Sequence, residues 1–321
     1  MRALQATLIQ LSLLTLLLAG ARLLPSEQRS TAAQEAEPTD AAYPPPSEGR
    51  LRNLSTRGRV EAGDAAMISG FIVRDAPVQV VLRALGPDLA RRDVAGTLQD
   101  PLLRLFRDGV ELQHNDDWGD TEALDALVAS GLAPADPREA AILTTLEPGR
   151  YTGIVEDADG GAGIGLVEIF QVDGAGTLAN LSTRARVASG DDVLIGGLMV
   201  SGERTTVLIR AIGPDLAEHG VPGALQDPVL HLVRGGRVIA VNDDWVDSRQ
   251  ADFLRAQGLA PAHSKESAMV VTLGPSRYGG YTAVLSGAGG AGGVGLIEVN
   301  QLSNALQPVP HAILPPDGDA R

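Results

Sequence analysis

The fold is decided by a stretch that reads DPLLRLF at residues 100–106 and NDDW at residues 115–118. The same pattern returns as DPVLHLV at residues 227–233 and NDDW at residues 242–245. Both parts are displaced by the same distance, since 227 − 100 and 242 − 115 both give 127, and the only two tryptophans of the chain close the two copies. Solenoid repeats are about 20–50 residues long, so this period indicates a duplicated, domain-sized unit.

The duplication extends well beyond these two blocks. Further segments recur at the same spacing: LSTR at 54–57 and 181–184, VLRALGPDL at 81–89 and LIRAIGPDL at 208–216, and GLAP at 131–134 and 258–261. We therefore expect two tandem domains, at residues 51–176 and 177–307. The connection between them, around residues 173–177, is short enough that the two units are expected to touch.

Local patterns within each copy are mostly those of β-strands. Six short apolar or alternating segments are bounded by Gly, Pro or Asp: Met67–Val73, Val78–Leu85, Leu102–Phe106, Ala141–Leu146, Tyr151–Val155 and Gly165–Val172. One helix is expected at residues 121–130, with Asp120 as its N-cap and Gly131 as its left-handed end. In the second copy Asp247 or Ser248 would begin this helix and Gly258 would end it.

About eight strands per copy, without alternating helices, predict an all-β protein. The expected architecture is two tandem jelly-roll-like antiparallel β-sandwich domains, each with one short helix. The cores should be aliphatic, because 44% of the 321 residues are hydrophobic but only 3% are aromatic.

Charge and cysteine content exclude several classes of protein. The formal net charge is −14, which argues against a nucleic-acid partner, because phosphate binding needs clustered Lys and Arg. The chain has no cysteine, so disulfides, thiol catalysis and zinc–thiolate sites are absent.

The two ends of the chain have the composition of export and linker segments. Residues 1–21 read as a signal peptide, with Arg2 before an apolar run at residues 8–18 and a cleavage site at residues 19–21. A retained membrane anchor is the alternative, but a span needs about 20 apolar residues. Residues 22–50 read as a Pro-rich disordered linker and residues 308–321 as a disordered tail. We expect a bacterial protein that is secreted, periplasmic or on the cell surface, with no membrane span after cleavage.

Residues 100–118 with 149–169, and residues 227–245 with 280–299, share a recognisable order of motifs. This order is Asp-x-x-Leu-x-Leu, a Gly turn, Asn-Asp-Asp, Gly-x-Tyr-Thr and a Gly-rich hairpin. It resembles bacterial pre-peptidase C-terminal domains and tandem modules of unknown function in exported bacterial proteins. The resemblance implies a non-catalytic jelly roll that accompanies extracellular machinery and sometimes binds calcium or polysaccharide. No protease domain precedes these modules, which departs from the usual setting.

The two acidic turns are candidate calcium sites. Ca²⁺ takes six to eight oxygen ligands, and each copy offers several in a short span. The candidates are Asp100, Asn115, Asp116, Asp117, Asp227, Asn242, Asp243 and Asp244. An EF-hand is excluded, because the loop lacks the required Gly and Glu. The alternative is a structural turn in which the Asn and Asp side chains bind nearby backbone N–H groups.

Two arginines, Arg83 and Arg210, lie inside apolar strands. A buried guanidinium must be paired, because an isolated charge in a low-dielectric interior is very costly. Recurrent acids supply the candidate partners for structural ion pairs: Glu139, Glu168 and Asp100 in the first copy, and Glu266, Glu298 and Asp227 in the second. The alternative is that these arginines bind a ligand.

Catalytic machinery finds little support in the sequence. None of the five histidines recurs between the copies, and neither a nucleophile elbow nor His-Glu-x-x-His occurs. The glycines at 290–295 match a dinucleotide fingerprint formally, but a strand pattern follows them where that motif needs a helix, so no cofactor other than calcium is expected. We expect a binding or adhesion module for an extracellular protein or polysaccharide. The alternatives are a structural spacer or assembly subunit and, less favoured, a secreted hydrolase with paired carboxylates.

Overall fold

The structure is a computed structural model that describes residues 49–63, 66–189, 192–202, 204–276, 280–302 and 312–313. The predicted signal peptide lies outside the described residues. So do the predicted linker, except residues 49–50, and the predicted tail, except residues 312–313. These three assignments stay predictions.

The described part of the first repeat includes eight strands, two short α-helices and one 3-10 helix. They are β1 (Arg50–Val60), β2 (Met67–Arg74), β3 (Val78–Leu85), α2 (Pro87–Ala90), β4 (Pro101–Arg107), β5 (Val110–Asn115), η2 (Trp118–Asp120), α3 (Leu124–Ser130), β6 (Ala140–Leu146), β7 (Gly149–Asp157) and β8 (Gly163–Gly174).

The described part of the second repeat has the same order of elements with one more 3-10 helix, and a two-residue strand from the predicted tail follows it. They are β9 (Thr177–Val187), β10 (Leu194–Ser201), β11 (Thr205–Ile212), α4 (Pro214–Glu218), β12 (Pro228–Arg234), β13 (Arg237–Asn242), η3 (Trp245–Asp247), α5 (Ala251–Ala256), β14 (Ser267–Leu273), β15 (Tyr281–Gly287), η4 (Ala288–Gly290), β16 (Gly293–Gln301) and β17 (Ala312–Ile313).

Strand pairing within each repeat is that of a jelly roll. In the first repeat the strands lie in the order β1-β8-β3-β6 in one half and β2-β7-β4-β5 in the other, with antiparallel neighbours. The second repeat has the corresponding orders β9-β16-β11-β14 and β10-β15-β12-β13. The all-β jelly-roll prediction is therefore confirmed, and each of the six predicted strand segments lies in one of these strands.

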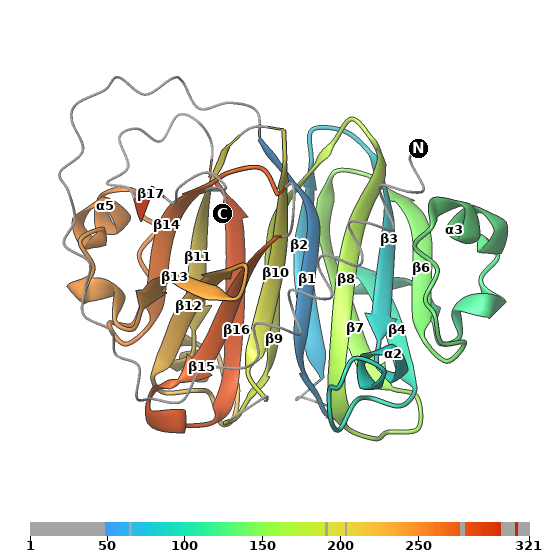
Figure 1. Cartoon of the computed structure of the whole chain (residues 1–321), viewed down its shortest axis with the longest axis horizontal. Coiled ribbons are helices and arrows are strands. Elements are labelled where there is room, and N and C mark those ends of the chain that lie inside the picture. Colours follow the sequence, from blue (N-terminus) through green and yellow to red (C-terminus); the bar gives the residue numbers. More distant parts are fainter. Residues whose placement is uncertain are drawn as a thin grey trace, which may run out of the picture.

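The two repeats share both of their sheets. β1 pairs with β8 of its own repeat and with β10 of the second, while β9 pairs with β16 of its own repeat and with β2 of the first. The first sheet therefore runs β6-β3-β8-β1-β10-β15-β12-β13. The second sheet runs β17-β14-β11-β16-β9-β2-β7-β4-β5, with β17 parallel to β14. Figure 1 shows the repeats side by side, with β1, β2, β9 and β10 in the middle. The predicted boundaries of two separate domains, 51–176 and 177–307, stay predictions.

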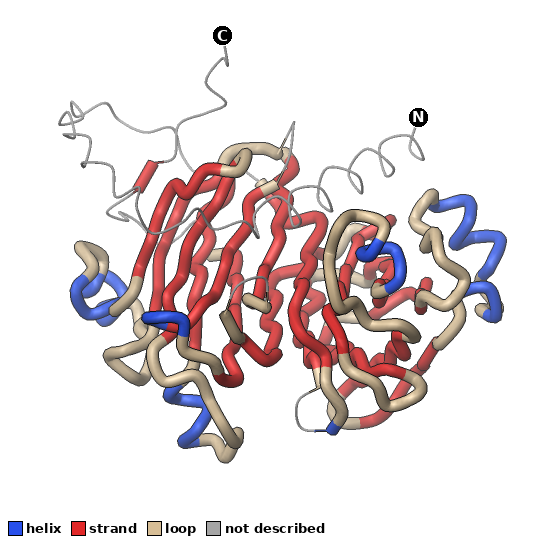
Figure 2. Tube along the Cα trace, turned by 60° about the horizontal axis from the view of Figure 1, so that its bottom comes forward, coloured by secondary structure: helices blue, strands red, loops and turns tan. Residues whose placement is uncertain are grey.

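The hydrophobic core is also continuous across the repeats. One cluster of buried apolar side chains contains Leu54 and Phe71 from the first repeat and Leu181 and Leu198 from the second. It is mainly aliphatic, as the composition predicts, because successive side chains of a strand point to opposite faces and the aliphatic ones point inward. Figure 2 shows the strands in the middle and the helices at the periphery.

The helices differ from the prediction in two ways. α3 begins at Leu124, later than expected, and Asp120 lies in η2 and does not cap α3. The glycines that end the helices were predicted correctly. Gly131 follows α3 directly with φ 73°, and Gly258 lies two residues after α5 with φ 66°. α2 and α4 were not predicted, so the described part of each repeat has two short α-helices and not one. Both α2 and α4 begin at a proline, a residue that is favoured in the first helical turn. Both helices are too short to give a periodic pattern of apolar residues in the sequence.

None of the described helices is long and apolar enough to cross a membrane.

Candidate functional site

Strand pairing brings the two parts of each acidic motif together. Asp227 directly precedes β12, and the NDDW block begins at the last residue of β13. Because β12 and β13 are antiparallel, with Leu230 opposite Asn242, the start of one strand lies beside the end of the other. The first repeat has the same hairpin, with Leu103 opposite Asn115.

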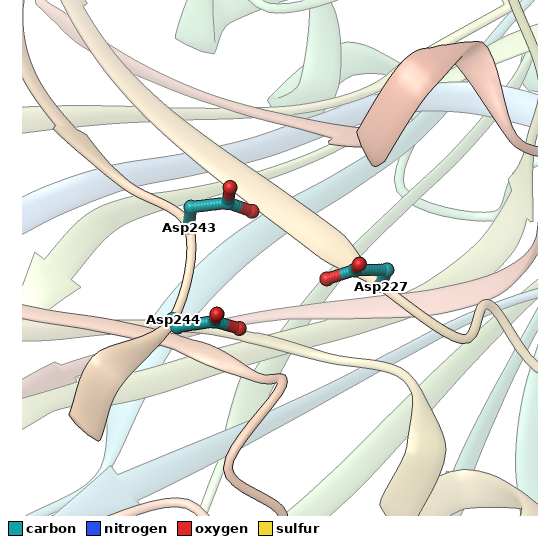
Figure 3. A group of neighbouring side chains, drawn as sticks. All are labelled: Asp227, Asp243 and Asp244. Atoms are coloured by element: carbon teal, nitrogen blue, oxygen red, sulfur yellow. The ribbon is translucent and has the colours of Figure 1, made fainter. Parts of the chain in front are cut away.

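Three carboxylates converge in the second repeat. Asp227, Asp243 and Asp244 each offer an oxygen atom, and these atoms lie within 4.8 Å of one another. Figure 3 shows the three carboxylates close together. Burial and the neighbouring charges of Asp227 and Asp244 raise the pKa of Asp243. Such convergent hard oxygen ligands are suited to a cation such as Ca²⁺.

A lysine already neutralises part of this cluster. Lys265 Nζ lies 3.4 Å from Asp244 Oδ2 and 3.5 Å from Asp227 Oδ2. Its hydrogen bond to Asp244 and the charges of both carboxylates raise the pKa of Lys265. The ammonium group therefore competes with any metal ion for the same oxygens.

The first repeat arranges its acids differently. Arg138 stands at the position of Lys265, because 265 − 127 is 138, but its Nε lies 3.1 Å from Asp136 Oδ1. Burial, followed by the charges of Asp116 and Asp117, raises the pKa of Asp100. Among the described residues, only the second repeat places three acids close enough to share a metal ion.

The two asparagines that were predicted as metal ligands are engaged in the turns. Asn242 Oδ1 accepts a hydrogen bond from Ala268 N at 2.7 Å, and its Nδ2 donates to the Asp244 carbonyl at 3.3 Å. Asn115 makes the equivalent bonds with Ala141 N and the Asp117 carbonyl, at 2.7 and 2.9 Å. These amides fix the turn and the neighbouring strand, which is the structural role weighed against calcium for this motif.

Register decides which acid pairs with each of the two strand arginines. Arg83 lies directly opposite Glu168, and Arg210 lies directly opposite Glu298. Both arginines form an ion pair with the facing carboxylate. The first pair is completely buried, whereas the side chains of Arg210 and Glu298 are 25% and 18% exposed. Arg83 also donates to the Leu132 carbonyl at 2.9 Å.

Glu139 and Glu266, predicted as ion-pair partners, have a different role. Glu139 Oε1 accepts hydrogen bonds from the backbone N–H groups of Gly86 and Asp88, at 3.1 and 2.9 Å. Glu266 holds the equivalent turn through Gly213 and Asp215, at 3.1 and 3.0 Å. A carboxylate that caps two buried N–H groups satisfies donors at the start of a short helix.

The turn that Glu139 holds explains why Gly-Pro-Asp recurs in both repeats, a role that the sequence pattern alone did not indicate. A side chain at Gly86 would place its Cβ 2.3 Å from the Leu98 carbonyl oxygen, so only glycine fits. Desolvation of the buried carboxylate raises the pKa of Glu139 to about 7. Asp100 and Asp227, the other candidate partners of the arginines, lie at the acidic turns.

Comparison with known proteins finds no matching family and no matching curated protein. Among solved structures, the major capsid protein P2 from Bacteriophage PM2 has 11% identity and a TM-score of 0.20, over 80% of this chain and 99% of that chain. The STIV MCP has 12% identity and a TM-score of 0.21, over 79% of this chain and 96% of that chain. At such scores the similarity carries no argument about function.

Proposed function

We propose that this protein is a non-catalytic, exported module that binds an extracellular protein or polysaccharide. The charged side chains that recur in both repeats support this reading, because they hold the fold: Arg83 and Arg210 pair with facing glutamates, and Glu139 and Glu266 cap backbone turns. The resemblance to bacterial pre-peptidase C-terminal domains favours the same class of function.

The observation that carries the proposal is a pair of exposed edge strands, β5 and β13. Within the described residues β5 pairs only with β4, and β13 pairs only with β12. Four of the seven exposed large apolar side chains in the described part lie on these strands: Val110 (64% exposed), Leu112 (50%), Val238 (49%) and Val241 (55%). A free strand edge with exposed apolar side chains suits the addition of a partner's strand or the docking of an extended chain.

Both edge strands pair with their neighbours in the same register, and both pairings contain a bulge. A bulge interrupts the β4–β5 pairing between Leu105 and Phe106, and an equivalent bulge lies between Leu232 and Val233, 127 residues later. Bulges bend a strand and redirect its side chains. The two repeats therefore present equivalent backbone edges at opposite ends of the shared sheets, which suits a ligand with repeated binding sites. Their exposed apolar side chains stand at different positions, since Arg237 and Ile239 correspond to Val110 and Leu112.

Lysine substitutions test this surface. The mature chain is screened against glycans and matrix proteins, and each hit is measured again with the variants V110K/L112K and V238K/V241K. We expect each double variant to weaken binding by about tenfold or more, because a charge in a desolvated apolar contact is costly. V128K is the matched control, since Val128 is 54% exposed but lies on α3. Full binding by both double variants would contradict the proposal, and a chain that binds nothing would favour the spacer alternative.

We propose calcium binding at Asp227, Asp243 and Asp244 as a second candidate function, supported by their convergence. Lys265 must be displaced before an ion enters, so K265M is expected to bind Ca²⁺ more tightly than the wild-type chain. Calcium should raise the melting temperature of K265M by several degrees, and EDTA should reverse the rise. The additional change D243N should abolish the response. If neither calcium nor EDTA changes the melting temperature of K265M, the site is ruled out.

A further inference from the structure

The two junctions between the repeats are equivalent, residue by residue. In the β1–β10 junction Leu54 faces Leu198 and Thr56 faces Gly196. In the β9–β2 junction Leu181 faces Phe71 and Thr183 faces Ser69. Each residue of the first junction can be replaced by its equivalent in the other repeat, which lies 127 positions away. This replacement gives the residue pairs of the second junction. The repeats are thus related by an approximate twofold axis, with the same register on both sides.

Equivalent residues meet each other on this axis. Thr56 and Thr183 correspond in the two repeats, and their buried hydroxyl oxygens are 2.8 Å apart. Self-contact between corresponding residues is the property that defines an isologous, self-complementary interface. Ser69 adds a 3.0 Å hydrogen bond to Thr183, whereas its counterpart Gly196 has no hydroxyl group.

The junction is part of the hydrophobic core. Leu54, Phe71, Leu181 and Leu198 are between 0% and 2% exposed and belong to one apolar cluster. Two ladders of backbone hydrogen bonds accompany this buried surface, each interrupted by one bulge at the equivalent place. Obligate subunit interfaces have the same character, since they resemble a domain core cut in half.

We propose that the first two strands of each repeat form a self-recognition surface whose partner is another copy of the repeat, so that this chain is a covalently linked twofold dimer. The recognising surfaces are β1 with β2, and β9 with β10. Residues 175–176 are the whole connection between β8 and β9, so the covalent link adds little to the junction itself.

Pairing between identical repeats is compatible with the same register. Two second repeats would place Leu181 opposite Leu198 and Thr183 opposite Gly196. Two first repeats would place Leu54 opposite Phe71 and Thr56 opposite Ser69. At these two positions apolar residues face apolar residues, and small residues face small ones, in each kind of pair. The arginines also keep their neighbours, because Arg57 faces Ile195, Arg184 faces Ile68, and an exchange of partners leaves an arginine opposite an isoleucine.

A cleavable connection tests the proposal in the full chain. A flexible segment with a protease site is inserted between Gly174 and Thr177, and the folded protein is cut and measured by light scattering. We expect the cut protein to keep the mass of the uncut control. Separation of the halves in native buffer would overturn the proposal.

A second measurement tests self-recognition itself. The cut protein is unfolded in urea and refolded, and native mass spectrometry counts the pairs. The proposal predicts first–first and second–second pairs beside the original first–second pair. Refolding into first–second pairs alone would overturn it, because the surfaces would then be complementary but not self-complementary. Binding of an external ligand does not enter either readout, since β5 and β13 lie at the far edges of the sheets.

Discussion

Replacing Arg83 by methionine is expected to lower the free energy of unfolding by about 3–5 kcal/mol, because Glu168 would remain as a buried and uncompensated charge. Both side chains of this pair are completely buried, and Glu168 Oε1 has no hydrogen-bond partner among the described residues. Urea unfolding of the wild-type chain and the variant at neutral pH gives the difference.

The equivalent variant in the second repeat is the matched control. R210M removes the partner of Glu298, but these side chains are 25% and 18% exposed, so water can solvate the remaining carboxylate. We expect a clearly smaller loss of stability than in R83M. The double variant R83M/E168L should recover most of the loss, since well-packed apolar residues can replace a buried ion pair. Equal losses in R83M and R210M would show that burial does not set the cost.

Glu139 is expected to make the stability of the protein depend on pH. Its pKa is about 7 in the folded chain and 4.5 without the environment of the fold, because burial disfavours the charged form; the nearby charge of Asp88 acts in the same direction. A carboxyl group with a raised folded pKa stabilises the fold below pH 4.5 and loses this contribution as the pH rises through 7. Between pH 5 and pH 8 the loss should reach about 2–3 kcal/mol.

The variant E139Q isolates this contribution. Its amide oxygen can still accept hydrogen bonds from Gly86 and Asp88 but does not titrate, so E139Q should gain stability relative to the wild-type chain as the pH rises. Urea unfolding at several pH values measures the difference between the two proteins, which removes the effect of all other titrating groups. E266Q, at the equivalent turn, measures the cost of exchanging a carboxylate for an amide. A constant difference between E139Q and wild type from pH 5 to 8 would contradict the assignment.

The sequence by itself determined the duplication, the all-β class and most of the strands. These features are local: the alternation of Val80 and Leu82 with their neighbours, and the turn residues around each strand, are properties of a few consecutive residues. Local chemistry also placed Gly131 at the end of a helix and showed that Arg83 needs an acidic partner.

Only the tertiary structure decided which elements become neighbours. An alternating strand pattern shows which side chains share a face, but it does not show which strand lies beside it, because that depends on hydrogen bonds between segments far apart in the chain. The register of β3 with β8 therefore places Glu168, and not Glu139, opposite Arg83. The pairing of β1 with β10 joins the two repeats into a shared sheet. Lys265 reached the acids of the second repeat in the same way, through a long-range approach that no local pattern encodes.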